Sequence, residues 1–226
     1  MENKLAEFGY RMKFPMKSGD LSRRWCSAYL KIMVADTVLR NMNSVAANLT
    51  KTRKDKKLLI VSGERRGESV GRSKYNEIEI HRTNAVSKHH RTVHQWRPVI
   101  DYSERDIWEV LKRHKVNPHP CYRAGWNRCS CAMCIFSTPR LFAGIRELYP
   151  KEYALLCQDE KILGFTLDNH CDLETYIGSA DSCVYHGDKE AIQSLLTGEF
   201  PVESVYVKGK WKYPAGAFHG AAGGPC

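Results

Sequence analysis

Four cysteines crowd one short stretch of the chain, NPHPCYRAGWNRCSCAMCIF at residues 117–136. They are Cys121, Cys129, Cys131 and Cys134. In Cys131-Ala-Met-Cys134 the two intervening residues let both sulfurs face the same way, so a single turn can present two thiolates to one soft metal centre. We therefore expect this stretch to bind zinc or a 4Fe–4S cluster, which the spacing alone does not separate. Isolated reduced cysteines and a disulfide are the alternatives.

The use of cysteine across the chain favours metal binding over a disulfide. The chain has 9 cysteines, an odd number, and its polar opening MENKLAEFGY is not a signal peptide. A dense cysteine cluster in such a chain is typical of a metal site in a reducing compartment. No run approaches the ~18 apolar residues of a membrane span. We expect a cytoplasmic protein without a membrane partner.

The charge balance indicates a polyanionic partner. The 226 residues carry 35 Lys and Arg against 25 Asp and Glu, a net charge of +10. Nucleotide phosphates and nucleic acid are the usual partners of such a chain, and a solvated basic surface is the simpler alternative. The length suits one domain or slightly more.

A second stretch whose residues could bind a ligand begins at residue 58. Leu58-Leu59-Ile60-Val61 is a continuous apolar run, typical of a strand buried on both faces. It leads into a Gly/Arg/Ser loop, and open α/β sheets place their ligand sites beyond the carboxyl ends of such strands. Arg65, Arg66 and Arg72 could form a fork for phosphate or sulfate oxygens, because guanidinium groups bind these oxyanions bidentately. An exposed basic loop without a ligand is the alternative.

One further cysteine stands apart from the cluster. A helical pattern begins at Leu21, and within it Cys26 follows Arg23 and Arg24. Neighbouring cations lower the pKa of a thiol, which suits a metal ligand or a reactive thiolate. A buried structural cysteine is equally consistent with this pattern.

Helix signals flank the cysteine stretch and predict how it is held. Ser103 with Asp106 predicts a capped helix before it. Pro139 at the first position of a helix, and a second helix from Pro150 ended by Gly164, are predicted after it. A last helix at 188–196 and a strand at 202–207 are expected to follow.

Several motifs in one order resemble the PAPS reductase-like family, particularly its phage and mobile-element members and those that place sulfur in the DNA backbone. The motifs are RRWCSAYLK, LLIVSGERRGES and WRPVIDYSERDIWEVLKRHKVNPHPCYRAGWNRCSCAMC. The resemblance covers roughly Phe8 to Pro150. It implies an α/β fold, a parallel sheet flanked by helices of the adenine nucleotide alpha-hydrolase-like kind, here partial. Residues 1–150 would form this part, including the cysteine cluster, 151–213 a helical extension and 214–226 a flexible tail.

The resemblance also implies roles for particular residues. Those that would face a nucleotide such as ATP or PAPS, or its sulfate, are Arg65, Glu68, Ser69 and Arg72, with Arg66 in the same loop. Relatives that carry a 4Fe–4S cluster ligate it with a cysteine of the first segment and the later Cys-x-x-Cys. The corresponding ligands are Cys26, Cys131 and Cys134, with Cys121 or else Cys129 as the fourth.

Two motifs of the family are missing. The Ser-Gly-Gly-x-Asp-Ser loop that holds the phosphates is not in the chain, and Ser62-Gly63-Glu64 lacks the second glycine that lets backbone approach a phosphate. The Glu-Cys-Gly tail of sulfonucleotide reductases does not match Cys226, which follows Gly-Gly-Pro. We therefore expect a truncated or split member, or one that has lost nucleotide chemistry.

Three functions remain open at this level. The leading one is part of an ATP-pyrophosphatase-type enzyme in sulfur transfer or nucleic-acid modification, with a 4Fe–4S cluster and a partner polypeptide that carries the phosphate loop. The alternative is a non-catalytic, metal-stapled module that binds nucleic acid or a partner protein. A genuine phosphoadenylyl-sulfate reductase is the further alternative.

Overall fold

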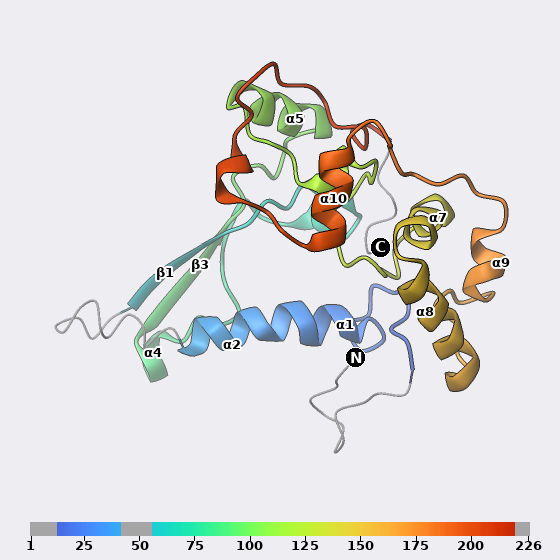
Figure 1. The fold of residues 1–226 in the computed structure, drawn as a ribbon. Helices are drawn as coiled ribbons and strands as arrows, with labels where there is room; N and C mark the ends of the chain where they lie inside the picture. The colour runs from blue at the N-terminus through green and yellow to red at the C-terminus, as the bar shows by residue number, and fades with distance from the viewer. Residues whose placement is uncertain (1–12, 42–55, 220–226) are drawn as a thin grey trace. The chain divides into compact units, whose positions relative to one another are not determined.

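A computed structural model describes residues 13–41 and 56–219 of the chain (Figure 1). The described residues form two compact units: residues 18–102, and residues 13–17 together with 103–219. The boundary expected at residue 150 falls inside the second unit, and that division stays a prediction. Among the described residues, no helix is both long and apolar enough to cross a membrane.

The first unit is built on a three-stranded sheet in the order β1-β3-β2. β1 (Lys56–Val61) pairs in parallel with β3 (Arg91–Trp96), whereas β2 (Ile78–Ile80) pairs antiparallel with β3. The expected parallel sheet is therefore only partly right, because the observed sheet is mixed. The short connection from β2 to β3 explains this, since a parallel pair needs a crossover of a dozen or more residues.

The apolar run in β1 is not buried on both faces, which corrects the expectation from the sequence. Leu59 and Val61 are 59% and 57% exposed, whereas Leu58 and Ile60 are partly buried. Among the described strands β1 is at the edge of the sheet, with β3 as its one neighbour. A continuous apolar run cannot distinguish a central strand from an edge strand with one face uncovered.

A helical segment completes the first unit. It consists of α1 (Trp25–Ser27), a π-helical turn (Ala28–Ile32) and α2 (Met33–Asn41). Buried Asp36 on α2 accepts hydrogen bonds at 2.7 and 3.0 Å from Arg82, and these lower the pKa of its carboxyl although burial opposes the shift. This ion pair joins α2 to the segment between β2 and β3.

The second unit is mainly helical. The elements are α5 (Glu104–Arg113), α6 (Pro120–Arg123), α7 (Pro139–Leu148), α8 (Pro150–Leu163), α9 (Leu173–Ile177), α10 (Lys189–Thr197) and η4 (Val202–Val205). Helices α5, α7 and α8 begin where their sequence signals predict, whereas α6 and α9 were not predicted. Ser103 caps the first helix by accepting a hydrogen bond from the Asp106 amide, and Gly164, with φ of 62°, ends the longest. Instead of the strand expected at 202–207 there is a short 3-10 helix, η4, followed by a single β-bridge between Val116 and Tyr206.

Part of the tail expected to be flexible is packed. The amide of Gly216 donates to the Tyr122 carbonyl at 2.8 Å, and Ala217 is buried against Trp108 and Trp211. A Cβ at Gly216 would lie 1.9 Å from the Trp126 carbonyl oxygen, so only glycine allows this approach. Residues 220–226 lie outside the described part of the chain.

A buried carboxylate organises the turn between α8 and α9. Glu160 is 5% exposed and accepts hydrogen bonds from the backbone amides of Leu167 at 2.7 Å and Leu173 at 2.9 Å. Buried amides need such partners. The side chain of Glu160 therefore supplies the acceptors that hold this turn.

Replacing Glu160 by alanine should lower the free energy of unfolding, by about 1–3 kcal/mol for each buried amide left without a partner. Glu160→Gln keeps one carbonyl acceptor and should cost less than Glu160→Ala. Urea denaturation followed by tryptophan fluorescence measures both. The control is Asp159→Ala, an exposed position on the same helix, which should change stability by no more than about 0.5 kcal/mol. Equal effects at 159 and 160 would contradict the role assigned to Glu160.

Candidate functional site

The arginine loop, residues 62–75, begins at the carboxyl end of β1. Because β1 and β3 run parallel, the segments that follow them leave the sheet at the same edge. The Ser62 amide donates to the Trp96 carbonyl at 3.0 Å, and the Arg66 amide donates to the Ile100 carbonyl at 2.8 Å. The loop thus lies at the edge where open α/β sheets place their ligand sites.

Glu68 brings the predicted nucleotide-facing residues together. Its carboxylate lies 2.6 Å from Nη1 of Arg72 and 3.5 Å from Nε of Arg65. The hydroxyl of Ser69 accepts a hydrogen bond from the Arg72 amide at 3.2 Å. A guanidinium group has five N–H donors, so each arginine keeps donors beyond its contact with Glu68. Two oriented, partly exposed guanidinium groups on either side of one carboxylate can still bind an oxyanion.

Arg66 takes a different place from the other two arginines. Its Nε donates to Asp101 at 2.6 Å, and its Nη1 donates to the carbonyls of Ser73 at 3.2 Å and of Tyr75. These contacts join the two ends of the loop to the segment after β3. The structure therefore groups Arg65 with Arg72 around Glu68, whereas Arg66 fastens the loop.

Arg97 is a residue of this edge that the sequence reading missed. Its side chain is 4% exposed and donates to Glu64 at 2.6 Å and to Glu79 at 2.7 Å. Burial would lower the pKa of Arg97, but the hydrogen bonds to Glu79 and Glu64 raise it on balance. The only signal in the sequence is an arginine between the end of a strand and Pro98. Arg97 holds β2 and the start of the arginine loop against β3.

The second group of chemically capable side chains is in the second unit. Ligand atoms of His119, Cys121 and Cys129 all lie within 4.8 Å of one another. His119 is the N-cap of α6, and its ring nitrogen Nδ1 accepts a hydrogen bond from the Cys121 amide at 3.2 Å. Pro120 occupies the first position of this short helix, which suits its fixed φ. The His-Pro-Cys sequence thus places an imidazole and a thiol side by side.

Cys129 is brought to Cys121 by a tyrosine. The Cys129 amide donates to the hydroxyl of Tyr122 at 3.2 Å, one residue beyond Cys121. The hydrogen bond with the Cys129 thiol, and burial, raise the pKa of the Cys121 thiol above its usual range. A metal ion bound here would have to displace the proton of the Cys121 thiol, because thiols bind metals as thiolates.

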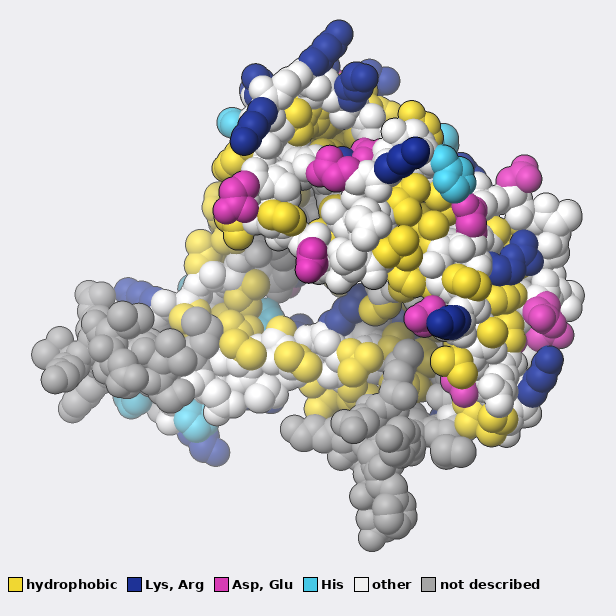
Figure 2. Space-filling model, viewed as in Figure 1, with side chains coloured by type: hydrophobic (Ala, Val, Ile, Leu, Met, Phe, Trp, Pro, Cys, Tyr) yellow, Lys and Arg dark blue, Asp and Glu magenta, His cyan; other side chains and the backbone are white. Residues whose placement is uncertain are grey.

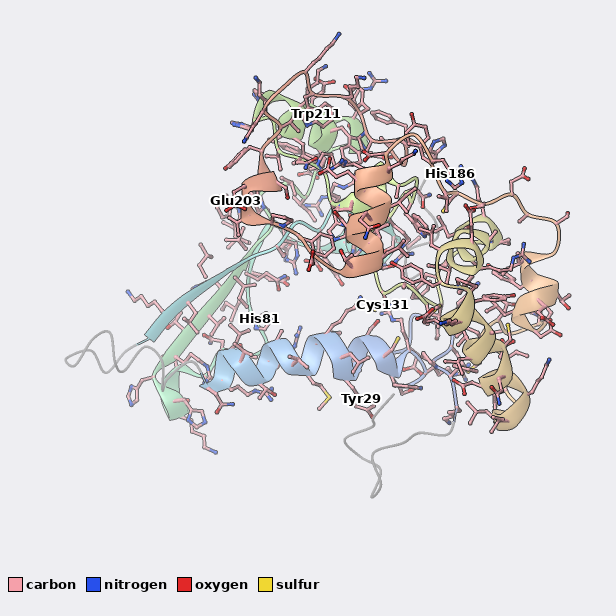
Figure 3. The ribbon with its side chains drawn as sticks, in the orientation of Figure 1. Tyr29, His81, Cys131, His186, Glu203 and Trp211 are labelled. Carbon is pink, nitrogen blue, oxygen red and sulfur yellow. The ribbon has the colours of Figure 1, made fainter. Side chains whose placement is uncertain are left out.

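A pocket of about 100 Å³ surrounds this pair and contains part of the predicted ligand set. Its lining includes Cys121, Cys129 and Cys131, and Cys131 lies in the loop beside α10 (Figure 3). Cys134 is partly buried and is not among the lining residues, whereas Cys26 is on α1 in the first unit. No disulfide joins the cysteines in the part of the chain that the structure describes. The ligand set Cys26, Cys121, Cys131 and Cys134 stays a prediction.

His119 is the residue of this pocket that cysteine spacing could not reveal. The sequence places it two residues before Cys121, but a histidine beside a proline carries no metal signature by itself. Imidazole and thiolate are both zinc ligands, and a structural zinc site would need a fourth one beside these three. Two sulfur ligands of one tetrahedral zinc ion lie about 3.8 Å apart, given a Zn–S bond of about 2.3 Å. The three ligand atoms, all within 4.8 Å of one another, could share one ion after a small closing movement.

Comparisons with known proteins place these features in a family. A sequence model of the phosphoadenosine phosphosulfate reductase domain matches residues 11–137 of the 226. An uncharacterised 37.8 kDa protein of Escherichia phage 186 is 30% identical over 71 residues, which are 31% of this chain and 21% of the phage protein. An adenosine 5'-phosphosulfate reductase of Burkholderia cepacia is 30% identical over 74 residues, 33% of this chain and 27% of the reductase.

A more distant relative gives a longer match. An uncharacterised protein of Methanocaldococcus jannaschii is 24% identical over 128 residues, 57% of this chain and 26% of that protein. The matched part is thus less than a third of each of these relatives. No solved structure matches the chain. With more than half of its residues matched by the domain model, the chain belongs to the phosphoadenosine phosphosulfate reductase domain family.

Proposed function

We propose that this chain is the nucleotide-binding and metal-binding part of an ATP-pyrophosphatase-type enzyme that acts in sulfur transfer or nucleic-acid modification. The observation that supports this most directly is the pair of arginines, Arg65 and Arg72, held by Glu68 at the carboxyl edge of β1 and β3. The relative from Burkholderia cepacia is named for its action on adenosine 5'-phosphosulfate. The ligand class proposed for the loop is accordingly an adenine nucleotide carrying phosphate or sulfate.

The loop would bind the anionic end of such a nucleotide. Glu68 orients both guanidinium groups before the ligand arrives, which reduces the entropy lost on binding. Charge-assisted hydrogen bonds from arginine to phosphate or sulfate are short and strong. Glu68 itself repels an anion, so the ligand would be contacted by the guanidinium N–H groups that Glu68 does not use.

Catalysis on a polyphosphate needs more than this loop. In-line transfer requires the phosphates to be fixed by several donors, usually with Mg²⁺. The described loop offers guanidinium donors, and the family's Ser-Gly-Gly-x-Asp-Ser motif is not in the sequence. We propose that a partner polypeptide supplies that motif, and that the complex acts in the cytoplasm, where thiols stay reduced.

The pocket lined by Cys121, Cys129 and Cys131, here called the cysteine pocket, is the proposed metal site. The ligands are Cys121, Cys129 and His119, with Cys131 from the same lining as the fourth. Zinc in such a site is structural and adds its binding energy to folding. A 4Fe–4S cluster is the competing occupant, and it would have to draw on Cys131, Cys134 and Cys26 as the family resemblance implies.

A non-catalytic module is the second candidate, and one observation favours it. Arg65 and Arg72 are paired with Glu68, and Arg66 is paired with Asp101. A phosphate must compete with these carboxylates for the same donors. If the pairs serve only the fold, the chain is a metal-stapled binding module rather than part of an enzyme, and genuine phosphoadenylyl-sulfate reduction is excluded with it.

Protein purified without oxygen should contain about one metal ion per chain, measured as zinc, iron and acid-labile sulfide. Stoichiometric zinc without sulfide is the expected result, because the grouped ligand atoms suit one shared ion. Iron with an equal amount of sulfide would instead support the cluster and its cysteine set. Anaerobic protein with neither metal would contradict both forms of the proposal.

Cys121→Ser and His119→Ala should each reduce the metal content and lower the thermal midpoint, because binding and folding are coupled. The matched control is Cys157→Ser, since Cys157 is buried on α8 and is not in the metal-binding group. Cys157→Ser should keep the metal even if it costs stability. Loss of metal from Cys157→Ser, or retention by His119→Ala, would overturn this ligand set.

The isolated chain should bind ATP and PAPS more weakly than micromolar in calorimetry and should not turn either over, because it fixes only one side of a phosphate. With a partner that carries the phosphate loop, binding should tighten, and Arg65→Ala should then weaken it by about 1–3 kcal/mol. Lys57→Ala removes an equal charge from an exposed position on β1 and should have little effect. Micromolar binding or turnover by the chain alone would contradict the need for a partner. An unchanged affinity in Arg65→Ala would support the non-catalytic module.

A further inference from the structure

A lysine-rich segment follows η4 in the second unit, beyond the part matched by the family model. Val207 and Trp211 pack into the cluster around Trp108, whereas Lys208, Lys210 and Lys212 are exposed. Figure 3 shows Trp211 beside α5. The segment thus presents a row of three exposed ammonium groups, while Val207 and Trp211 anchor it to the second unit.

The segment is fixed by hydrogen bonds to the chain that follows α5. The Val207 amide donates to the Lys115 carbonyl at 2.8 Å, and Trp211 Nε1 donates to the Val116 carbonyl at 2.8 Å. The Asn117 amide donates to the Val205 carbonyl at 2.8 Å. These contacts bring the row of lysines next to the basic end of α5.

Together the two segments form one charged surface, here called the basic face. Lys and Arg side chains gather over α5 and the neighbouring C-terminal segment in Figure 2. Lys112 and Arg113 are in the last turn of α5, where the helix dipole stabilises cations. The lysines after η4 are not in a helix, so this explanation does not apply to them. The basic face consists of Lys112, Arg113, Lys115, Lys208, Lys210 and Lys212, all of them exposed.

The row of lysines borders a groove that also contains aromatic side chains. The groove encloses about 800 Å³, and its lining includes Tyr185, Tyr206 and Tyr213 beside the three lysines. Tyr206 is 65% exposed and Tyr185 is 51% exposed, so much of each side chain is open to solvent. Exposed rings interleaved with cations are the features by which proteins bind bases and phosphates of an unpaired strand.

The lining of the groove also includes three carboxylates. Asp188 accepts hydrogen bonds from Arg123 at 2.8 and 2.9 Å, and Glu190 lies 3.3 Å from the same guanidinium. Glu203 is an exposed carboxylate, which repels an anion. An anionic strand would therefore be held by the lysines rather than by these carboxylates.

We propose that the basic face and the groove beside it bind single-stranded nucleic acid. The lysines of the row would contact successive phosphates, and Tyr206 and Tyr185 would stack with bases turned into the groove. The arginine loop and the cysteine pocket contribute no residue to this surface. The proposal therefore stands independently of the proposed nucleotide chemistry and metal.

The experiment is fluorescence anisotropy of labelled oligothymidylate and oligouridylate with the whole chain, over a series of salt concentrations. The variant K208Q/K210Q/K212Q should bind more weakly, and the slope of log affinity against log salt should fall by about 2, or 0.7 for each lost phosphate contact. Tyr206→Ala should weaken binding at least about fivefold, the lower end of the effect of stacking on one ring. Glu203→Gln should strengthen it.

The matched control is K57Q/K74Q/K88Q, which removes the same charge from exposed lysines of the first unit. It should retain both the affinity and the salt slope. Equal losses in the two triple variants, no binding of either oligonucleotide at low salt, or binding of anionic phosphatidylserine vesicles in place of oligonucleotides would each overturn the proposal. Thermal unfolding of K208Q/K210Q/K212Q should match the unmodified chain, because the changed side chains are exposed. A preference between the two oligonucleotides identifies DNA or RNA as the ligand.

Discussion

The parallel pairing of β1 with β3 is the constraint on which the first unit depends. It sends the arginine loop and the segment after Trp96 out of the same edge of the sheet. Arg97 stabilises this edge by binding Glu64 on one side and Glu79 on the other, while almost wholly buried. A buried guanidinium is tolerated only when its donors are matched, so these carboxylates are needed at their positions. Glu64 lies at the start of the loop that Glu68 organises, and the geometry of the loop depends on that match.

In the second unit, close contacts between backbone segments hold the turn that carries the cysteines. Gly125, with φ of 111°, follows α6, and a Cβ there would lie 1.9 Å from the Cys183 carbonyl oxygen. The Tyr185 amide donates to the Ala124 carbonyl at 2.8 Å in the same region. The segment near residue 184 thus holds the turn between Cys121 and Cys129. The residues that make these contacts, Cys183 and Tyr185, lie beyond the region that the family model matches, whereas the cysteines of the pocket lie within it.

The net positive charge is used differently in the two units. At the sheet edge, arginines are paired with carboxylates, which orients them and reduces the field that a distant anion would meet. On the basic face, lysines stand exposed on a fixed segment, where they can attract a polyanion over about a Debye length. The first arrangement suits a small ligand that contacts particular donors. The second suits an extended ligand recognised mainly by charge.

Elements whose signals are local could be predicted from the amino-acid sequence. The cap at Ser103, the proline starts of α7 and α8 and the stop at Gly164 are all confirmed, because a cap or a turn depends on a few neighbouring residues. The motifs also identified the family and located the arginine loop after a strand. Cysteine spacing pointed to a metal-binding stretch, and a possible metal-binding group is found there.

Features that depend on distant residues could be identified only in the folded protein. The antiparallel direction of β2, the exposed face of β1 and the packing of Gly216 follow from neighbours that no local pattern names. The same holds for Arg97 and for the row of lysines beside α5, whose partners are far away in the sequence. His119 joined the two cysteines because α6 and Tyr122 place the side chains together. Residue types and spacing fix what a segment can do, whereas burial and proximity are set by the whole folded unit.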